Sequence, residues 1–316
     1  MYYIINKTVN LMMGGENVEI NIKKALDEAL DEVLDGENHG NVADYIPVLA
    51  RVNPNYFSAA VKNSGEIYSS GDEVIFSIQS VSKVITLVMA LEKLGEEVVF
   101  NHVGMENSPF AFNDIRTIGS KATNPFVNAG AITTVGLLYN LFKDNTTDEI
   151  INFMKDISGY DGIRIDEEVF ESEMATCSMN RALAYYLKHL GLIDGDTESV
   201  LREYIKTCAI TTSCSTLASI AEAIAMDGAE QISEGACSKA MSLMAICGMY
   251  NRTGEFLASV GIPAKSGVSG VVMAVVPGKY GICVYSPVLD EFGNSYRGVK
   301  FLEILSKKLN LSIFKG

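Results

Sequence analysis

The pattern of apolar and polar residues near the N-terminus predicts one helix followed by strands. In residues 20–34, apolar side chains recur every three or four positions with acidic residues opposite them, which is typical of an amphipathic helix. Residues 56–61 and 66–69 predict a β-hairpin around the sequence KNSG at 62–65, in which Gly65 supplies the positive φ of the turn. Residues 74–78 predict one more short strand.

The rest of the chain is helical in pattern until strands return near its end. A mostly apolar helix is expected after residue 80, and further helical patterns occupy residues 129–143, 148–157, 179–191, 197–207, 214–226 and 236–247. Residues 269–276 and 280–285 predict strands, and residues 299–309 a closing helix. This order predicts an α+β fold: one antiparallel sheet built from the N- and C-terminal segments, with an inserted helical region and a site between them.

The length and composition allow one large unit. With 316 residues, of which 48% are hydrophobic, the chain can bury a substantial core. We expect residues 1–316 to form a single functional unit with a sheet lobe at about 40–80 and 255–316. A helical lobe is expected at about 81–254, and residues 1–39 form an N-terminal extension and helix. No repeat of about 33 residues, the ankyrin period, is visible.

Charge and cysteine content narrow the class of partner and the compartment. Lys and Arg total 25 against 39 Asp and Glu, and the net charge of -14 argues against binding to nucleic acid or to an anionic membrane. No apolar stretch approaches the ~18 residues that span a bilayer. The N-terminus has no basic region followed by an apolar segment and a cleavage site. The six cysteines form no C-x-x-C pair, so we expect free, mostly buried thiols in the cytoplasm.

Ser80 and Lys83 are the strongest candidates for catalysis. They form an S-x-x-K pair at the expected start of a helix, so both side chains share one helix face. The positive end of the helix favours negative charge near the Ser80 hydroxyl. Lys83 can accept the serine proton only if its pKa falls from about 10.4 to near neutrality, which costs about 4 kcal/mol and requires a buried or cation-flanked lysine. Ser82 points to another face and is expected to be structural.

The sequence lacks the residue patterns that two other classes of hydrolase require. His39, His102 and His189 have no zinc-binding spacing, and no G-x-S-x-G sequence is present. These absences argue against a zinc hydrolase and against a Ser-His-Asp hydrolase of the α/β type. Cys177 could be a reactive thiol, but without a histidine nearby in sequence it is better interpreted as a bystander.

Lys265, Ser266 and Gly267 form a K-S-G triplet just ahead of the expected strand at 269–276. In the predicted sheet, this triplet would approach the Ser80 turn. A Lys-Ser/Thr-Gly triplet facing an S-x-x-K serine is the layout of the penicillin-recognising hydrolases. On its own, K-S-G usually marks a turn or cap, so the role of Lys265 stays open between function and structure.

Six motifs in order make the chain resemble one family. It is similar to the serine-dependent glutaminases of the β-lactamase-like superfamily, in the bacterial form without ankyrin repeats, from about residue 40 to the C-terminus. The motifs are ADYIP at 43–47, QSVSK at 79–83, NPFVNAGAI at 124–132, Ser172-Glu173 with Asn180-Arg181, CGMY at 247–250 and PAKSGV at 263–268.

The resemblance implies an activity and a set of site residues. The activity is hydrolysis of L-glutamine to L-glutamate and ammonia without a cofactor, in a homo-oligomer (dimer or tetramer). Ser80 would be the acyl-enzyme nucleophile, Lys83 its base and Tyr250 a proton-transfer partner. The implied substrate contacts are Tyr45, Ser80, Asn128, Glu173, Asn180, Tyr204, Tyr250 and the backbone of Val268.

These residue types suit glutamine, although each has a structural alternative. Glu173 can pair with the α-ammonium, while the amides and phenols of Asn128, Asn180, Tyr45 and Tyr204 can donate to the α-carboxylate. The N–H groups of Ser80 and Val268 can hold the oxyanion. Alternatively, Glu173 is a solvated acid, Asn124 and Asn128 are helix caps, and Tyr204 is a core aromatic. Two further functions stay open: another amide or lactam hydrolase on the same fold, and a non-catalytic protein that binds amino acids.

Overall fold

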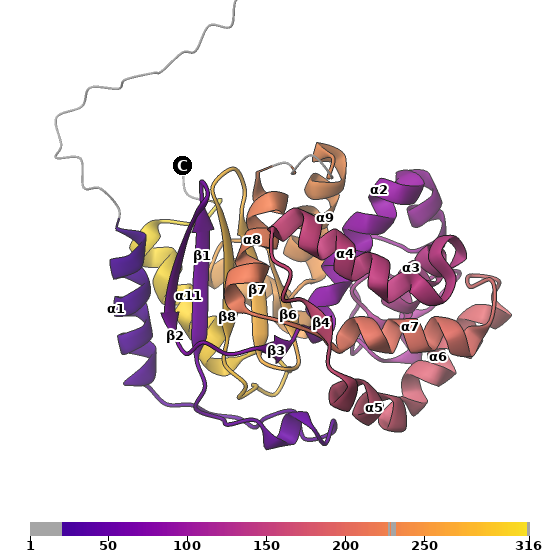
Figure 1. Cartoon of the computed structure of the whole chain (residues 1–316), viewed down its shortest axis with the longest axis horizontal. Coiled ribbons are helices and arrows are strands. Elements are labelled where there is room, and N and C mark those ends of the chain that lie inside the picture. The colour runs from indigo at the N-terminus through magenta and orange to yellow at the C-terminus, as the bar shows by residue number, and fades with distance from the viewer. Residues whose placement is uncertain (1–20, 227, 229–231, 315–316) are drawn as a thin grey trace, which may run out of the picture.

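A five-stranded antiparallel sheet lies in the left half of the molecule as drawn in Figure 1, between two groups of helices. The computed structural model describes residues 21–226, 228 and 232–314. Most of the expected N-terminal extension, and the first residue of the helix predicted at 20–34, lie outside this range. The strand order is β2-β1-β8-β7-β6. The strands are β1 (Ser58–Asn63), β2 (Glu66–Gly71), β6 (Ala264–Gly267), β7 (Val271–Val276) and β8 (Tyr280–Tyr285).

Strands from the N-terminal and C-terminal parts of the chain pair with each other in this sheet. The expected hairpin is confirmed: β1 pairs with β2 around a turn in which both Ser64 and Gly65 have positive φ. Strand β1 also pairs antiparallel with β8, with Ser58 opposite Tyr285. The α+β class and the antiparallel sheet built from both chain ends are therefore confirmed.

Two layers of helices cover the sheet because side chains alternate across each strand. Met273 and Cys283 pack into a cluster with helices of the inserted region, whereas Val272 and Val284 pack with the first and last helices. The helices of the second layer are α1 (Ile22–Leu34) and α11 (Tyr296–Leu309). The helices of the inserted region are α2 (Ser82–His102), α3 (Asn128–Phe142), α4 (Thr146–Ser158), α5 (Glu167–Thr176), α6 (Ser178–His189), α7 (Thr197–Cys208), α8 (Cys214–Ala225) and α9 (Glu234–Cys247).

The expectation of a single sheet is wrong. A second antiparallel sheet has the order β3-β5-β4. Its strands are β3 (Phe76–Ser77), β5 (Ile210–Thr212) and β4 (Arg164–Ile165). They are only two or three residues long, too short to show an alternating pattern. The predicted strand at 74–78 is correspondingly shortened to β3.

The K-S-G triplet is part of a strand, not a segment ahead of one. Strand β6 pairs with β7 from Ala264 opposite Ala274 to Gly267 opposite Val271, and a turn through Gly270 (φ 100°) joins them. The helices α5 and α10 (Thr253–Ser259) were also not predicted.

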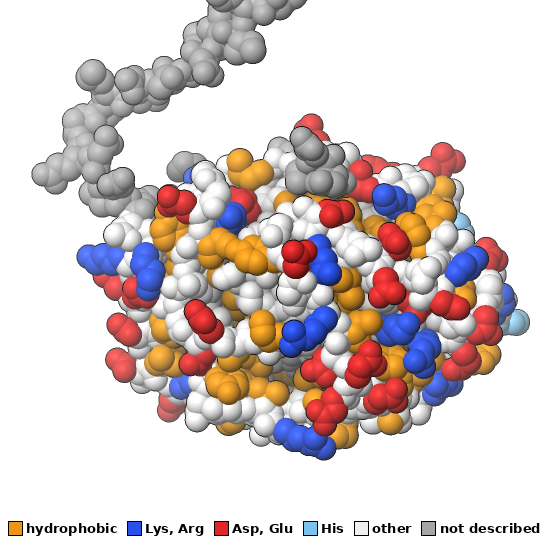
Figure 2. Space-filling model, in the orientation of Figure 1, with side chains coloured by type: hydrophobic (Ala, Val, Ile, Leu, Met, Phe, Trp, Pro, Cys, Tyr) orange, Lys and Arg blue, Asp and Glu red, His pale blue; other side chains and the backbone are white. Residues whose placement is uncertain are grey.

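The surface carries charges of both signs. On the face shown in Figure 2, Lys and Arg side chains are interspersed with Asp and Glu and form no continuous basic area. Within the described residues, no helix combines the length and the apolar character needed to cross a membrane.

Candidate active site

The segment before α2 fixes the backbone of Ser80. Strand β3 leads into a short 3₁₀ turn, Gln79–Val81, that continues directly into α2. The turn is tied to β5 because the Ile78 N–H donates to the Ile210 carbonyl at 2.8 Å. Gln79 has a φ of 47°, an unusual left-handed conformation for a residue with a side chain. Ser80 therefore lies just before the N-terminus of a long helix, as predicted.

Lys83 lies on the first turn of α2 and is buried, with 1% of its surface exposed. Its Nζ donates to Asn128 Oδ1 at 2.6 Å and to the Phe126 carbonyl at 3.2 Å. Burial lowers the pKa of Lys83 to about 8, although Cys208 and Glu173 oppose the shift. No ion pair of Lys83 occurs among the described residues. The expected buried lysine of lowered pKa is therefore present on the first turn of α2, three residues after Ser80.

Tyr250 lies next to this pair, at the start of a short 3₁₀ turn, with a φ of 51°. Its ring packs on that of Phe112, with centroids 4.8 Å apart. Burial raises the pKa of Tyr250, and the nearby Ser80 hydroxyl opposes the rise. The buried Tyr250 hydroxyl has no hydrogen-bond partner within the described part of the chain. The structure thus brings a neutral phenol to the serine.

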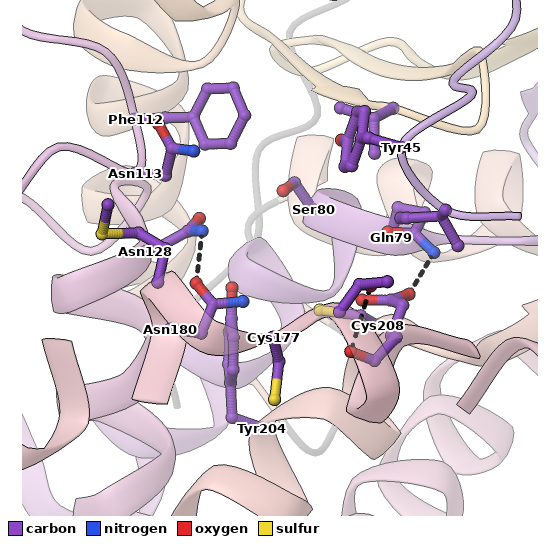
Figure 3. Close-up of a pocket in the computed structure, with 15 residues that line it drawn as sticks. Tyr45, Gln79, Ser80, Phe112, Asn113, Asn128, Cys177, Asn180, Tyr204 and Cys208 are labelled. Atoms are coloured by element: carbon purple, nitrogen blue, oxygen red, sulfur yellow. Dashed lines mark hydrogen bonds between the residues drawn. The ribbon is translucent and has the colours of Figure 1, made fainter. Parts of the chain in front are cut away.

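A polar cavity of about 230 Å³ opens over Ser80 (Figure 3). Residues of α3, α5, α6 and α7 line it together with Gln79, Ser80 and Val268, and the loop residues Tyr45, Ile46, Phe112 and Asn113 complete the lining. The predicted residues that line it are Tyr45, Ser80, Asn128, Glu173, Asn180, Tyr204 and Val268. Lys83 and Tyr250 are not among the lining residues and lie buried behind them.

Glu173, on α5, is buried in the cavity wall rather than solvated, so the reading as a surface acid is wrong. Gln79 Nε2 donates to Glu173 Oε1 at 2.6 Å. Burial raises the pKa of Glu173 to about 7, and the Gln79 hydrogen bond and Lys83 oppose the rise. The cavity therefore contains a carboxyl group that titrates near neutrality.

Two amides connect Lys83 to the cavity. Asn128 Oδ1 accepts from Lys83, and Asn128 Nδ2 donates to Asn180 Oδ1 at 2.8 Å (Figure 3). This chain of bonds leaves the Asn180 NH₂ group free to donate into the cavity. Asn128 is the first residue of α3 and not its cap, whereas Asn124 does cap a turn by accepting from the Phe126 and Val127 N–H groups.

Tyr204 is buried, as expected for a core aromatic residue. It also lines the cavity, as expected for a residue that contacts the substrate. Burial raises its pKa well above the usual value. Its hydroxyl therefore stays protonated and able to donate.

Several lining residues were not predicted as site residues. They are Ile46, Gln79, Phe112, Asn113, Thr176, Met179 and Cys208. The only sequence feature that indicates a role for Gln79 in the site is its position next to Ser80 in the QSVSK motif. Cys177 also lines the cavity, and burial raises its pKa, which disfavours a reactive thiolate. None of the six cysteines, all of them in the described part of the chain, forms a disulfide, and all six are buried, as predicted.

Lys265 is fully buried beside the site and does not line the cavity. Its Nζ donates to the Ser266 carbonyl at 2.5 Å and lies 4.5 Å from the centroid of the Tyr250 ring. Burial and the neighbouring Lys83 place the pKa of Lys265 well below its usual value. The expected approach of the K-S-G triplet to the Ser80 turn is confirmed, because a Cβ atom on Gly267 would lie 2.8 Å from the Ile78 carbonyl oxygen.

The three histidines lie outside the cavity. His39 contacts Glu37 at the surface, and His102 bonds the Val98 carbonyl near the end of α2. His189 ends α6 and stacks on Tyr186. None of them lines the cavity over Ser80.

Comparisons with known proteins agree on one family. A family model described as Glutaminase matches residues 40–314. A glutaminase of Clostridium tetani is 40% identical over 305 residues, covering 93% of this chain and 98% of the relative. A glutaminase of Alkaliphilus oremlandii is 44% identical over 287 residues, covering 87% and 94%.

Solved structures show the same fold. A probable glutaminase from Bacillus subtilis complexed with 6-diazo-5-oxo-L-norleucine superposes with a TM-score of 0.82 at 34% identity, covering 96% of this chain and 99% of that one. Mglu in its glutamate form gives a TM-score of 0.87 at 34% identity, covering 93% and 70%. The β-lactamase-like fold expected from the sequence is therefore confirmed.

Proposed function

The chain belongs to the glutaminase family of amidohydrolases, and we propose that it hydrolyses L-glutamine through an acyl-enzyme intermediate on Ser80. The observation that carries the proposal is a buried Lys83 one helical turn from a serine that faces a polar cavity. The names of the relatives support glutamine as substrate. The structure of Mglu in its glutamate form supports a cavity of amino-acid size in this fold.

Lys83 is the proposed general base. A neutral lysine amine has two N–H donors and one lone pair. The bonds to Asn128 and the Phe126 carbonyl use both donors, so the lone pair is left for the Ser80 proton. With a pKa of about 8, a useful fraction of Lys83 is neutral at neutral pH.

The proposed reaction has two steps. Ser80 Oγ attacks the side-chain amide carbon of glutamine while its proton moves to Lys83 Nζ. The N–H groups of Ser80 and Val268 stabilise the oxyanion; losing one such donor typically costs about 3 to 4 kcal/mol. The C–N bond then breaks, and ammonia leaves with the proton passed on through Tyr250. Water, deprotonated by the same amine, hydrolyses the ester to glutamate and frees Ser80.

The cavity is proposed to bind both ends of the amino acid. Glu173 pairs with the α-ammonium, since it is the acidic side chain of the cavity wall. Asn180, Tyr204, Tyr45 and the remaining N–H of Asn128 donate to the α-carboxylate. These donors are neutral side chains. We consider neutral donors suitable for binding the α-carboxylate of glutamine close to the carboxylate of Glu173.

We extend the proposal to the setting of the enzyme. Its six buried cysteines, none of which forms a disulfide in the described residues, support a reducing compartment, so we place the enzyme in the cytoplasm. The resemblance to bacterial glutaminases supports a single catalytic unit that assembles as a homodimer or homotetramer, which sedimentation velocity measures directly.

An ammonia-release assay tests the function. Purified protein is compared on L-glutamine, L-asparagine and a chromogenic lactam. Ammonia from glutamine alone is the expected result. Turnover of the lactam would favour a different hydrolase on the same fold, and glutamine binding without turnover would indicate a non-catalytic binding protein.

A further inference from the structure

Glu173 is a buried carboxyl group without an ion-pair partner. Its side chain is 8% exposed and lines the cavity. No Lys, Arg or His forms an ion pair with it in the described residues. Within the part of the chain that the structure describes, the hydrogen-bond donor to its carboxylate is the neutral amide of Gln79, at 2.6 Å. A buried carboxylate in this state is costly, so it binds either a proton or a cationic ligand.

Gln79 is held in place on both sides. Its side chain is buried, and the two N–H groups of the amide are used by Glu173 Oε1 and by Ser77 Oγ at 3.3 Å. Its backbone is held in a left-handed conformation of φ 47°, which is unfavourable for a residue with a Cβ atom and persists only where the surroundings impose it. The peptide that joins Gln79 to Ser80 carries the N–H proposed for the oxyanion. One residue therefore connects Glu173 to the nucleophile.

We propose that Gln79 is a positioning residue that directs Glu173 into the cavity and favours its anionic form, so that binding of the α-ammonium completes the ionisation of Glu173 and releases the proton that part of the molecules still carry. The proposal rests on the proposed function, because it concerns the same cavity and the same substrate. It predicts that recognition of glutamine is coupled to proton release, and that Gln79 sets the pH at which this coupling operates.

Most of the titratable groups near Glu173 cannot supply the proton that is released on binding. They are Lys83 from α2, Tyr204 and Cys208 from α7, Cys177 at the start of α6, and Tyr45 from the segment before β1. Burial raises the pKa of Cys208 to about 12 and raises those of Tyr45, Tyr204 and Cys177, so all four stay neutral near pH 7. Lys83 and Glu173 are the groups that titrate nearby.

The sign of the effect follows from the charges. Without ligand, the pKa of Glu173 is about 7, so close to half of the molecules carry its proton at pH 7. An α-ammonium stabilises the anion and lowers that pKa, so binding expels the proton and tightens as pH rises. Replacing the Gln79 amide by an apolar group removes a stabilising donor and moves this transition to higher pH.

Calorimetric titration tests the coupling in the full-length chain. L-Glutamine is titrated into the Ser80→Ala protein between pH 6 and 8.5, in buffers that differ in ionisation enthalpy, which counts the protons released. We expect about 0.5 proton per glutamine at pH 7. The release should vanish in Ser80→Ala/Glu173→Gln, which identifies Glu173 as its source.

The Gln79→Met change, made in the Ser80→Ala protein, tests the positioning role. Affinity at pH 7 should fall about tenfold, the usual weight of a hydrogen bond to a charged group, and should recover most of this loss at pH 8.5. Ser77→Ala in the same background is the matched control, because it removes the other acceptor of the amide and should leave the pH dependence unchanged.

Three outcomes would overturn the proposal. Glutamine binding without proton release would remove the coupling. An equal loss of affinity at every pH in Gln79→Met would reduce Gln79 to a structural residue. Absence of glutamine binding to folded Ser80→Ala protein would overturn the proposed function, and the ammonium subsite with it.

Discussion

At the scale of single residues, the site depends on two ionisable groups that are buried without forming an ion pair. Lys83 and Glu173 both line or adjoin one small cavity, yet they form no ion pair with each other. Burial therefore moves their pKa values toward neutrality from opposite sides, to about 8 and about 7. Large pKa shifts of this kind are typical of catalytic and binding groups. The same burial lowers the stability of the folded protein, so stability and activity place opposite demands on these residues.

The first prediction concerns Ser80 and Lys83. Ser80→Ala and Lys83→Met should each lower the turnover of glutamine by several orders of magnitude, because nucleophile and base act as one unit. The double variant should resemble either single variant. Ammonia release measures the effect, and thermal unfolding serves as the control for folding. Strictly additive losses, or activity retained in Ser80→Ala, would contradict the acyl-enzyme mechanism.

The pH dependence of kcat/KM should report both groups. Productive binding requires ionised Glu173 and neutral Lys83, so kcat/KM rises with pH through about 7 and about 8. Below pH 6.5 the logarithm of kcat/KM should approach a slope of 2, and Glu173→Gln should reduce that slope to 1. A slope of 1 in the unmodified enzyme would show that only one of the two groups controls the free enzyme.

Glu173→Gln should weaken activity and strengthen the fold. Deleting the charge removes the partner of the ammonium and should cost about 2 to 5 kcal/mol in kcat/KM for glutamine. The analogue 4-carbamoylbutanoate, which lacks the α-amino group, should be a poor substrate and lose little further. Equal losses for the two substrates would remove Glu173 from ammonium recognition.

The stability gain follows from the direction of the Glu173 shift. Its pKa rises from 4.5 to about 7 on folding, so the folded state binds more protons between these values and stability falls as pH increases through this window. Glu173→Gln removes that penalty and should raise the free energy of unfolding at pH 8 by up to about 3 kcal/mol. Urea denaturation at pH 5 and pH 8 measures it; a gain of equal size at both values would point to a cause other than ionisation.

At the scale of elements, the contact between β6 and the Ser80 turn joins the two segments that carry the proposed oxyanion donors, the N–H groups of Ser80 and Val268. A Cβ atom on Gly267 would lie 2.8 Å from the Ile78 carbonyl oxygen and 2.9 Å from Val271 Cγ1. Gly267→Ala should therefore displace the turn, lowering kcat by about 10 to 100-fold and stability by about 1 to 3 kcal/mol.

Gly254→Ala provides the matched control for this change. Gly254 lies within α10 with open space around it, so the added methyl group should be neutral or slightly stabilising. If Gly267→Ala retained full activity, the β6 contact would not position the site.

The helices and strands that could be predicted from the sequence are those in which apolar residues recur at a regular spacing. Helices such as α7 and α11 bury one face and expose another, so their residues recur at helical spacing. Helix α5 exposes most of its acidic residues and buries only Val169, Phe170 and Glu173, which leaves a weak period. Strand β6 contains a buried lysine and ends in a glycine, a composition that a strand pattern does not predict.

The site residues divide in a similar way. Ser80 and Lys83 are neighbours in sequence, so their spacing predicted their geometry. The contact between Gln79 and Glu173 joins positions 94 residues apart, and nothing in the local pattern of either segment indicates it. Tyr250 and Lys265 likewise meet only because β6 and the turn after α9 fold against each other.

At the scale of the whole molecule, the site forms where distant segments meet. Pairing of β1 with β8 brings the two ends of the chain into one sheet, and β6 at its edge faces the inserted helices (Figure 1). The serine turn, the carboxyl of α5 and the amides of α3 and α6 all depend on this closure. The activity is therefore a property of the complete fold.

The central claim is that glutamine acylates Ser80, and partitioning with hydroxylamine tests it most directly. If one glutamyl-enzyme forms, hydroxylamine and water compete for it after the leaving group has gone. The ratio of γ-glutamyl hydroxamate to glutamate should then be identical for L-glutamine and its side-chain N-methylamide, although their overall rates differ. A ratio that changes with the leaving group would show direct attack on the amide and contradict the acyl-enzyme account.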